Sequence, residues 1–389
     1  FYPSDPKTSF ASIIFQELPT KTEPDSPVKA LTELSAIFIK VWERCLQEEF
    51  FLPMRELVAL LSFTLQLHSV SIIPALVEKL LPIAQATLHV IDDIRNACSG
   101  PGAGDTELQN LYAHLDSTAV VALLGFCASV CATSSGVARA AFWRELPMET
   151  VLLVIGAKQP LPDIVGMLEM LTTSVLPGTI GPLGSGEPSV VTDRLLDKVS
   201  NFLVRNPAAA RTPSQRHAVV ASALRTLISF TADEVVARQM AAHKFVVTHA
   251  ISALSRSVEE LYDQELSATT LRRPRVSSLD EALAAADDPD SDPWNLCTVI
   301  SLATLLLHGI VLDPRTADLV GLEGRFKAWP LGGRRYLIAL CRLTFADEEA
   351  VLEGGVDSDT VERAHELLEM AVSVEGGKDV EMLFSSPGY

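Results

Sequence analysis

Residues 27–53 read PVKALTELSAIFIKVWERCLQEEFFLP. Apolar residues recur in this segment at spacings of three and four, which places them on one face of an α-helix. These residues are Leu31, Leu34, Ile37, Phe38, Val41 and Leu46. Proline is favoured at the first helical position, so Pro27 fits the start of a helix, and Leu52-Pro53 ends the pattern. The segment predicts one long amphipathic helix.

The same pattern extends outward along the chain. Further helices are predicted at about 54–68, 72–98, 116–132, 137–146, 162–176, 190–205, 213–229, 233–240, 243–266, 294–312, 315–322, 334–345, 347–352 and 357–372. Thr231 and Glu234 have the spacing of a capping box before one of these helices. The apolar run Val151–Ile155 is the one good strand candidate, although its helical surroundings favour a helix.

Short helices alternate with short loops throughout, and strand signals are almost absent. This pattern is typical of antiparallel helix pairs stacked side by side. It predicts an all-α fold, an irregular α-solenoid of HEAT-like or armadillo-like pairs, with more than half of the residues helical. A globular all-α bundle stays open as the alternative, because no fixed-period consensus is visible.

A segment rich in glycine and proline divides the chain into two halves. Residues 178–186 read GTIGPLGSG, which is typical of a linker, and we expect them to be poorly ordered. The predicted organisation is a helical-repeat half at 1–177, a linker at 178–188 and a second half at 189–389. Within the second half, the basic run Arg272–Arg275 and the acidic run Asp287–Asp292 indicate an exposed connector near 269–293.

Composition excludes several classes of protein. The 389 residues carry 31 Lys and Arg against 49 Asp and Glu, a net charge of −18, and 48% are hydrophobic. The chain is too apolar to be disordered, and its acidity argues against a general nucleic-acid or anionic-membrane surface. Six scattered cysteines without a CxxC motif predict reduced thiols in an intracellular protein. A first residue of Phe1 rather than Met predicts a piece of a longer protein.

Three stretches lack Asp, Glu, Lys and Arg over about the length that crosses a bilayer: 57–77, 117–138 and 293–312. No asymmetry of Lys and Arg around them marks a cytoplasmic side. Polar residues interrupt the first and third, and Ala-Thr-Ser-Ser-Gly ends the second. We predict buried helices of a repeat stack, because such stacks contain helices that are covered on several faces.

No catalytic, cofactor-binding or metal-binding residue is predicted. Cys127 and Cys131 are spaced for one helical face, but two further ligands are missing, so core packing is favoured. The glycines of 178–186 lack the preceding strand and following Lys-Ser/Thr of a phosphate loop. Asp287–Asp292 lacks the glycine and glutamate of an EF-hand. Gly332–Arg335 and Arg272–Arg275 are short basic islands, interpreted as solvated loops.

The two ends of the chain carry a family resemblance. Residues 1–6, FYPSDP, precede the helical array, and the chain closes with TVERAHELLEMAVSVEGG at 360–377 followed by Leu383-Phe384. These features resemble the C-terminal helical-repeat region of fungal ATRIP-type (ATR-interacting) checkpoint proteins. The resemblance implies a nuclear, non-catalytic scaffold of the DNA-damage response. Its implied partner is the ATR-type checkpoint kinase, a phosphatidylinositol-3-kinase-related kinase, bound through helical repeats of both proteins.

The same resemblance limits what this chain binds by itself. In that family the coiled coil and the RPA-binding segment lie N-terminal to the repeats. Contact with RPA-coated single-stranded DNA is therefore expected only through regions absent from this chain, and a homodimer is compatible with the full-length protein. Neither membrane binding nor direct nucleic-acid binding is expected of this chain. Phosphorylation at Ser26-Pro27 or Ser214-Gln215 is left open.

Apolar residues near the C-terminus are the predicted partner-binding surface. They are Val361, Leu367, Leu368, Met370, Leu383 and Phe384. The last repeat of a solenoid either presents a polar cap or offers its apolar stripe to a partner, and these residues stay apolar almost to the end. The alternative is that they pack only on the preceding helix. Two other functions also stay open: an unrelated transport or trafficking solenoid, and an all-α enzyme with a polar pocket.

Overall fold

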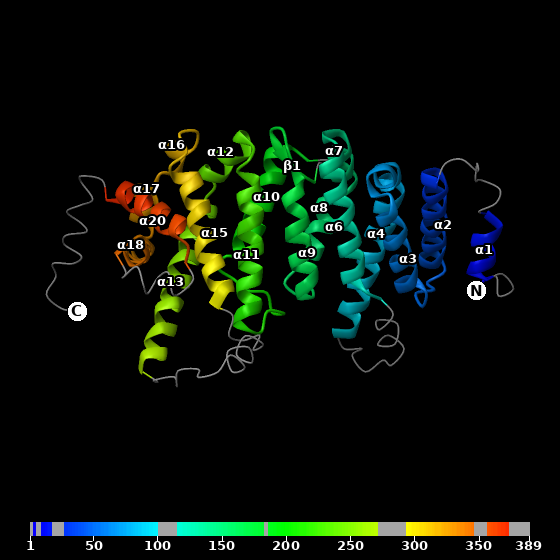
Figure 1. The fold of residues 1–389 in the computed structure, drawn as a ribbon, viewed down its shortest axis with the longest axis horizontal. Coiled ribbons are helices and arrows are strands. Elements are labelled where there is room, and N and C mark those ends of the chain that lie inside the picture. Colours follow the sequence, from blue (N-terminus) through cyan, green and yellow to red (C-terminus); the bar gives the residue numbers. More distant parts are fainter. Residues whose placement is uncertain are drawn as a thin grey trace. The chain divides into compact units, whose positions relative to one another are not determined.

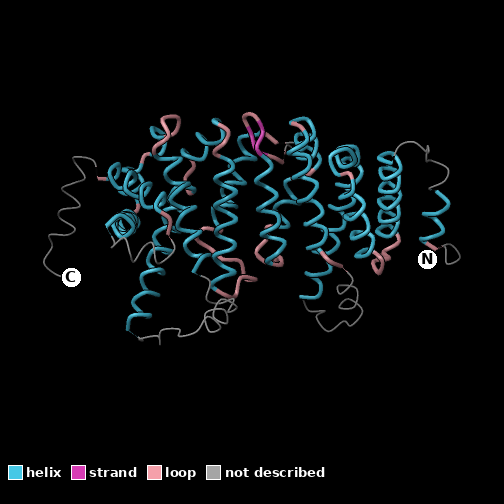
Figure 2. Tube along the Cα trace, viewed as in Figure 1, coloured by secondary structure: helices cyan, strands magenta, loops and turns pink. Residues whose placement is uncertain are grey.

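The computed structural model describes residues 3–4, 9–17, 27–99, 115–182, 186–270, 293–345 and 356–372. These residues are almost entirely helical (Figure 2), so the predicted all-α class is confirmed. They divide into two compact units, one within Phe1–Leu176 and Ile180–Val191 and the other within Pro177–Thr179 and Thr192–Tyr389. The predicted domain boundaries themselves stay a prediction.

The first unit is a row of helices in which neighbours in the sequence are neighbours in space (Figure 1). Its helices are α1 (Phe10–Glu17), α2 (Pro27–Gln47), α3 (Met54–Leu67), α4 (Ser69–Ser99), α6 (Ser117–Ser134), α7 (Gly136–Glu145), α8 (Met148–Val154), α9 (Leu161–Leu171) and the short 3₁₀ turn η1 (Thr172–Ser174). Helix α2 begins at Pro27 as predicted, and it buries Ile37, Phe38, Val41 and Trp42 against α3 and α4. The apolar stripe of the sequence is therefore the packed face of this helix.

Two short strands follow α9, where the sequence predicted the end of a helix and the start of a linker. Strands β1 (Val175–Leu176) and β2 (Thr179–Ile180) form a two-stranded sheet. Gly178 turns the chain between them with a φ of 76°, a conformation that favours glycine. The helical prediction through 176 is wrong because a turn fixed by glycine ends the helical pattern earlier. Residues 183–185 of the predicted linker lie outside the described residues.

The second unit surrounds α15, an apolar helix that packs against α11, α13 and α20. The helices of this unit are α10 (Pro188–Asn201, which begins in the first unit), α11 (Pro213–Phe230), α12 (Glu234–Ala242), α13 (Val246–Thr270), α15 (Pro293–Val311), α16 (Ala317–Val320), α17 (Leu322–Ala328), α18 (Pro330–Phe345) and α20 (Ser358–Ala371). The predicted connector near 269–293 lies mostly outside the described residues, and so does the predicted helix at 347–352.

One helix-capping prediction is wrong. The hydroxyl of Thr231 donates a hydrogen bond to the carbonyl of Ile228, so Thr231 ends α11 instead of capping α12. Helix α12 is capped by Asp233, whose carboxylate accepts from the backbone amides of Val235 and Val236. A true capping box opens α11, where Thr212 and Gln215 exchange bonds.

Two described helices are long and apolar enough to cross a membrane by length and composition alone, residues 69–98 of α4 and 117–134 of α6. Half of the apolar window of each is buried. The two helices pack against each other, and α4 also packs on α2 and α7 while α6 packs on α7 and α9. Buried core helices pass the same compositional test. Of the predicted charge-free stretches, 117–138 begins with α6, whereas 57–77 spans the end of α3 and the start of α4.

Candidate partner-binding surface

Helix α20 carries four of the six predicted partner-binding residues, and the structure separates them. Leu367 and Leu368 are buried, with Leu367 only 1% exposed, because α20 packs on α15 and α18. Val361 is half-buried, whereas the side chain of Met370 is 50% exposed. Leu383 and Phe384 lie outside the described residues. Leu367 and Leu368 thus anchor the helix, and Met370 is the member of the described four that is open to a partner.

Polar contacts hold α20 in place at its N-terminus. The Asp357 carboxylate caps the helix by accepting from the backbone amide of Thr360 at 2.8 Å, and it accepts from the hydroxyl of Ser301 on α15 at 3.0 Å. Burial raises the pKa of Asp357, but the hydrogen bonds from Thr360 and Ser301 outweigh it and hold this pKa below its usual value. Asp357 is therefore ionised at neutral pH, which suits a helix N-terminus.

A second polar contact joins α15 and α20 further along. The His308 Nε2 atom lies 2.6 Å from Glu366 Oε2. Both side chains are partly exposed, so the pair contributes little stability by itself. It lies beside the packed face of α20, whose rotation is set by the buried Leu367 and Leu368. With the buried leucines, this contact leaves one defined face of α20 toward solvent.

Helix α18 presents an apolar row that the sequence analysis missed. Leu331, Ile338 and Phe345 are 72%, 44% and 72% exposed. They are spaced by seven residues, about two helical turns, so they lie on one face of the helix. The opposite face is core, since Tyr336 and Leu340 are fully buried.

The outward face of α18 is also basic. Arg334, Arg335 and Arg342 are exposed on it, and residues 330–345 contain neither Asp nor Glu, although the whole chain carries a net charge of −18. The Arg342 guanidinium lies 4.9 Å from the centre of the Tyr262 ring on α13. Gly332–Arg335 is thus part of a helix, and its interpretation as a solvated loop is wrong.

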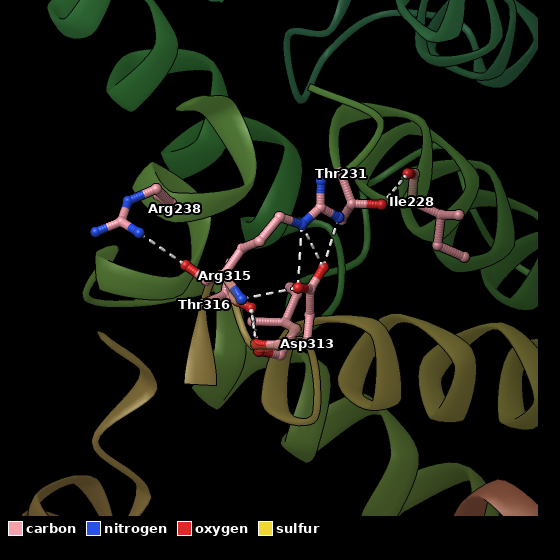
Figure 3. Close-up of polar contacts among 7 residues, drawn as sticks. Ile228, Thr231, Arg238, Asp313, Arg315 and Thr316 are labelled. Atoms are coloured by element: carbon pink, nitrogen blue, oxygen red, sulfur yellow. Dashed lines mark hydrogen bonds and ion pairs between the residues drawn. The ribbon is translucent and has the colours of Figure 1, made fainter. Parts of the chain in front are cut away.

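In the turn that follows α15, the basic side chain of Arg315 is paired with the carboxylate of Asp313 (Figure 3). The Arg315 Nε atom donates to both carboxylate oxygens of Asp313 at 3.0 and 2.9 Å. The hydrogen bond from Arg315 holds the pKa of Asp313 below its usual value. Arg238 of α12 donates to the Arg315 carbonyl at 3.0 Å. This cluster fixes the path from α15 to α16.

Cys127 and Cys131, the pair spaced for one helical face, are packed inside the first unit. The described residues contain no group of three or more His, Cys, Asp or Glu side chains placed to hold a metal ion. Cys127 and Cys131 are fully buried. Burial raises the pKa of Cys131 to about 11 and that of Cys127 further, so both thiols stay protonated at neutral pH. Their place in the core agrees with the packing interpretation.

Two family models and one solved structure that match this chain all belong to the same family. The family model "Rad26-like, helical repeats" matches residues 83–311, and the model "Rad26-like, C-terminal domain" matches residues 322–384. The crystal structure of a Rad26 fragment from Myceliophthora thermophila aligns with a TM-score of 0.83 at 32% identity, covering 96% of this chain and 95% of that one. Comparison with curated protein sequences gives no match.

These matches decide between the architectures left open by the sequence. The helical-repeat model covers more than half of the chain, including helices of both compact units, which a single globular bundle would not explain. The C-terminal model begins at α17 and includes α18 and α20, the elements that carry the exposed apolar row and the predicted residues. The chain belongs to the Rad26-like family of helical-repeat proteins, the fungal relatives of ATRIP.

Proposed function

We propose that this chain is a non-catalytic adaptor that binds and regulates an ATR-type checkpoint kinase in the nucleus during the DNA-damage response. Membership of the Rad26-like family supports the choice of partner. The observation that carries the binding site is the solvent-facing row of Leu331, Ile338 and Phe345 on α18. Met370 on the adjoining helix α20 adds a further exposed apolar side chain.

The shape of this row suits a helical partner. Side chains seven residues apart form a ridge along the helix, and a ridge of this kind packs into the groove of another helix. The arginines around the row favour a partner helix that carries acidic residues beside its apolar ones. An ATR-type kinase that offers its own helical repeats provides such a surface, and α18 lies in the segment matched by the C-terminal family model.

Aspartate at both Ile338 and Phe345 should abolish co-purification of the kinase with the full-length protein. Each large apolar side chain at the centre of an interface contributes on the order of 2 kcal/mol, so two such losses weaken binding by roughly a thousandfold. Because both side chains are exposed, the thermal melt should stay within about two degrees of the parent value. Affinity purification of tagged protein followed by immunoblotting measures the loss.

The control is Val137→Asp, an equally apolar and highly exposed position on α7 of the first unit. It should leave kinase recovery unchanged. Aspartate at Leu383 and Phe384 tests the sequence prediction in the same assay and is expected to abolish recovery with an unchanged melt. Full recovery by the Ile338 and Phe345 variant would show that α18 is not the binding face.

Single-stranded DNA should bind this chain weakly or not at all at physiological salt. A net charge of −18 opposes binding to a polyanion. Fluorescence anisotropy with a labelled oligonucleotide measures this. Salt-sensitive binding at submicromolar Kd would contradict the expectation and would give the chain a direct role on DNA.

A further inference from the structure

A cleft of about 680 Å³ lies in the second unit. The turn between α12 and α13 and the first two turns of α13 form one wall, with Phe245 as its largest side chain. The end of α16 and helix α17 form the other wall, which ends at Trp329. A space of this size holds one or two large side chains rather than a whole helix.

Arg325 clamps the two walls together. Its Nε atom donates to the Val320 carbonyl at 2.6 Å, and its two terminal nitrogens donate to the carbonyls of Lys244 and Ala241 at 3.0 and 2.8 Å. Burial lowers the pKa of this guanidinium, which nevertheless stays charged at neutral pH. The cleft is therefore formed in advance and carries a fixed positive charge.

The wall that contains Phe245 is aromatic. Phe245 stacks on the His249 ring with centroids 5.4 Å apart and ring planes 14° apart. Burial lowers the pKa of His249 and outweighs the opposing effect of the Ser200 carbonyl, which lies 3.1 Å from Nδ1, so the ring is neutral at pH 7. The Lys244 ammonium group lies 4.9 Å from the centre of the Phe245 ring, on the exposed rim. This apolar wall thus ends at a cationic rim.

A second hollow of about 360 Å³ shares Ser252 and Trp329 with the cleft. It is lined by Arg256 and Arg335, and by Glu259. The lining of the two hollows holds four cations, Lys244, Arg325, Arg256 and Arg335, and one carboxylate, that of Glu259, while Glu260 interacts with Arg256 from outside the lining. This local excess of positive charge stands out in a chain of net charge −18. It is complementary to an acidic ligand.

We propose that this cleft binds a linear acidic peptide segment of a partner protein through one inserted aromatic side chain. The aromatic ring lies between Phe245 and Trp329, and flanking carboxylates contact Lys244 and the arginines of the second hollow. A carboxylate fits better than a phosphate group, because three backbone carbonyls already occupy donors of the Arg325 fork. The cleft is distinct from the apolar row of α18, and Arg335 is the residue that borders both surfaces.

The test measures fluorescence anisotropy of a fluorescein-labelled peptide, Glu-Asp-Glu-Phe-Leu-Asp-Glu, titrated with the full chain. We expect a Kd of about 10 μM that weakens as salt rises. Replacing the peptide's phenylalanine with alanine, or its acidic residues with lysine, should weaken binding by at least about tenfold. A phosphoserine peptide that binds while the acidic peptide does not would overturn the proposal.

Two variants of the protein locate the site. Lys244→Glu reverses the rim charge, and Gly324→Leu fills the cleft at a position where an added Cβ meets nothing within 4 Å. Each should weaken peptide binding by about tenfold or more. The matched control is Lys327→Glu, which makes the same charge change at an exposed position on α17 that does not line the cleft, and it should stay within about twofold.

The outcomes separate this site from the kinase interface. Lys244→Glu and Gly324→Leu should leave kinase co-purification unchanged, since neither residue lies on α18. Equal peptide binding by the parent and Gly324→Leu would place the peptide elsewhere and overturn the proposal. Binding that appears only after Leu383 and Phe384 are replaced by alanine would also overturn it, because the chain's own end would then compete for the cleft.

Discussion

Leu367→Asp should lower the free energy of unfolding of the second unit by about 4 kcal/mol or more. Truncating a buried leucine costs 2 to 5 kcal/mol through lost burial and the cavity left behind, and a buried carboxylate without a partner adds to that cost. Leu367 is 1% exposed on the face of α20 that packs on α15 and α18. Urea unfolding followed by far-UV circular dichroism measures the loss.

Met370→Asp is the matched control, three residues further along the same helix. Its side chain is 50% exposed, so the expected change in stability is within about 0.5 kcal/mol. If Met370 contacts the kinase, this variant loses binding with its fold intact, whereas Leu367→Asp loses binding because α20 no longer packs. An unaltered urea midpoint for Leu367→Asp would show that α20 is not held as described and would return Leu367 to the candidate surface.

The helices that could be predicted from sequence are the long ones with a buried stripe. Helix α2 begins at the expected proline, and Ile37, Phe38 and Val41 of the predicted stripe are buried. An apolar pattern along one side of a 21-residue helix leaves water by packing that side against other helices. For the short helices, the sequence predicted one segment at 315–322, which corresponds to α16, and it missed α17. Gly321 separates them with a φ of 56°, and an isolated glycine does not reveal its dihedral angles in a sequence.

The sequence prediction also missed the first residues of α18, which include two glycines. The sequence prediction began this helix at residue 334 because Gly332 and Gly333 are poor helix formers. In the structure a Cβ on Gly332 would clash with the Trp329 ring, and one on Gly333 would meet the Phe326 ring at 3.0 Å. These glycines allow close packing of α17 on α18, and tertiary contact outweighs their low propensity. The exposed row at 331, 338 and 345 is visible only once the helix is extended back to Pro330.

The peptide cleft lies beyond sequence reasoning for a different reason. Arg325 reaches the carbonyls of Ala241 and Lys244, which lie 84 and 81 positions away along the chain. Every residue type has a backbone carbonyl, so no sequence motif indicates these hydrogen bonds of Arg325. The positive charge of the cleft likewise comes from residues that are far apart in the sequence, Lys244, Arg256, Arg325 and Arg335. The net charge of the whole chain does not show where basic side chains gather locally.

Trp143→Ala should destabilise the first unit by about 3 to 5 kcal/mol, the usual cost of removing a large buried aromatic side chain. Trp143 is fully buried on α7 and meets Phe142 edge to face, with centroids 5.4 Å apart. An alanine at Gly181 would place its Cβ 2.6 Å from the Trp143 side chain. Trp143 therefore joins α7 to the segment that the sequence assigned to a linker.

Gly181→Ala distinguishes a packed segment from a linker. If residues after β2 pack on Trp143, the added methyl group must displace the indole, at a cost of about 1 to 3 kcal/mol. A linker glycine would tolerate alanine without loss. Gly125→Ala on α6 is the control, because its Cβ meets nothing within 4 Å and alanine favours a helix, so stability should hold or rise by up to about 1 kcal/mol. Urea midpoints for Gly181→Ala and Gly125→Ala that match the parent's would mean that residue 181 belongs to a linker and that Trp143 packs without it.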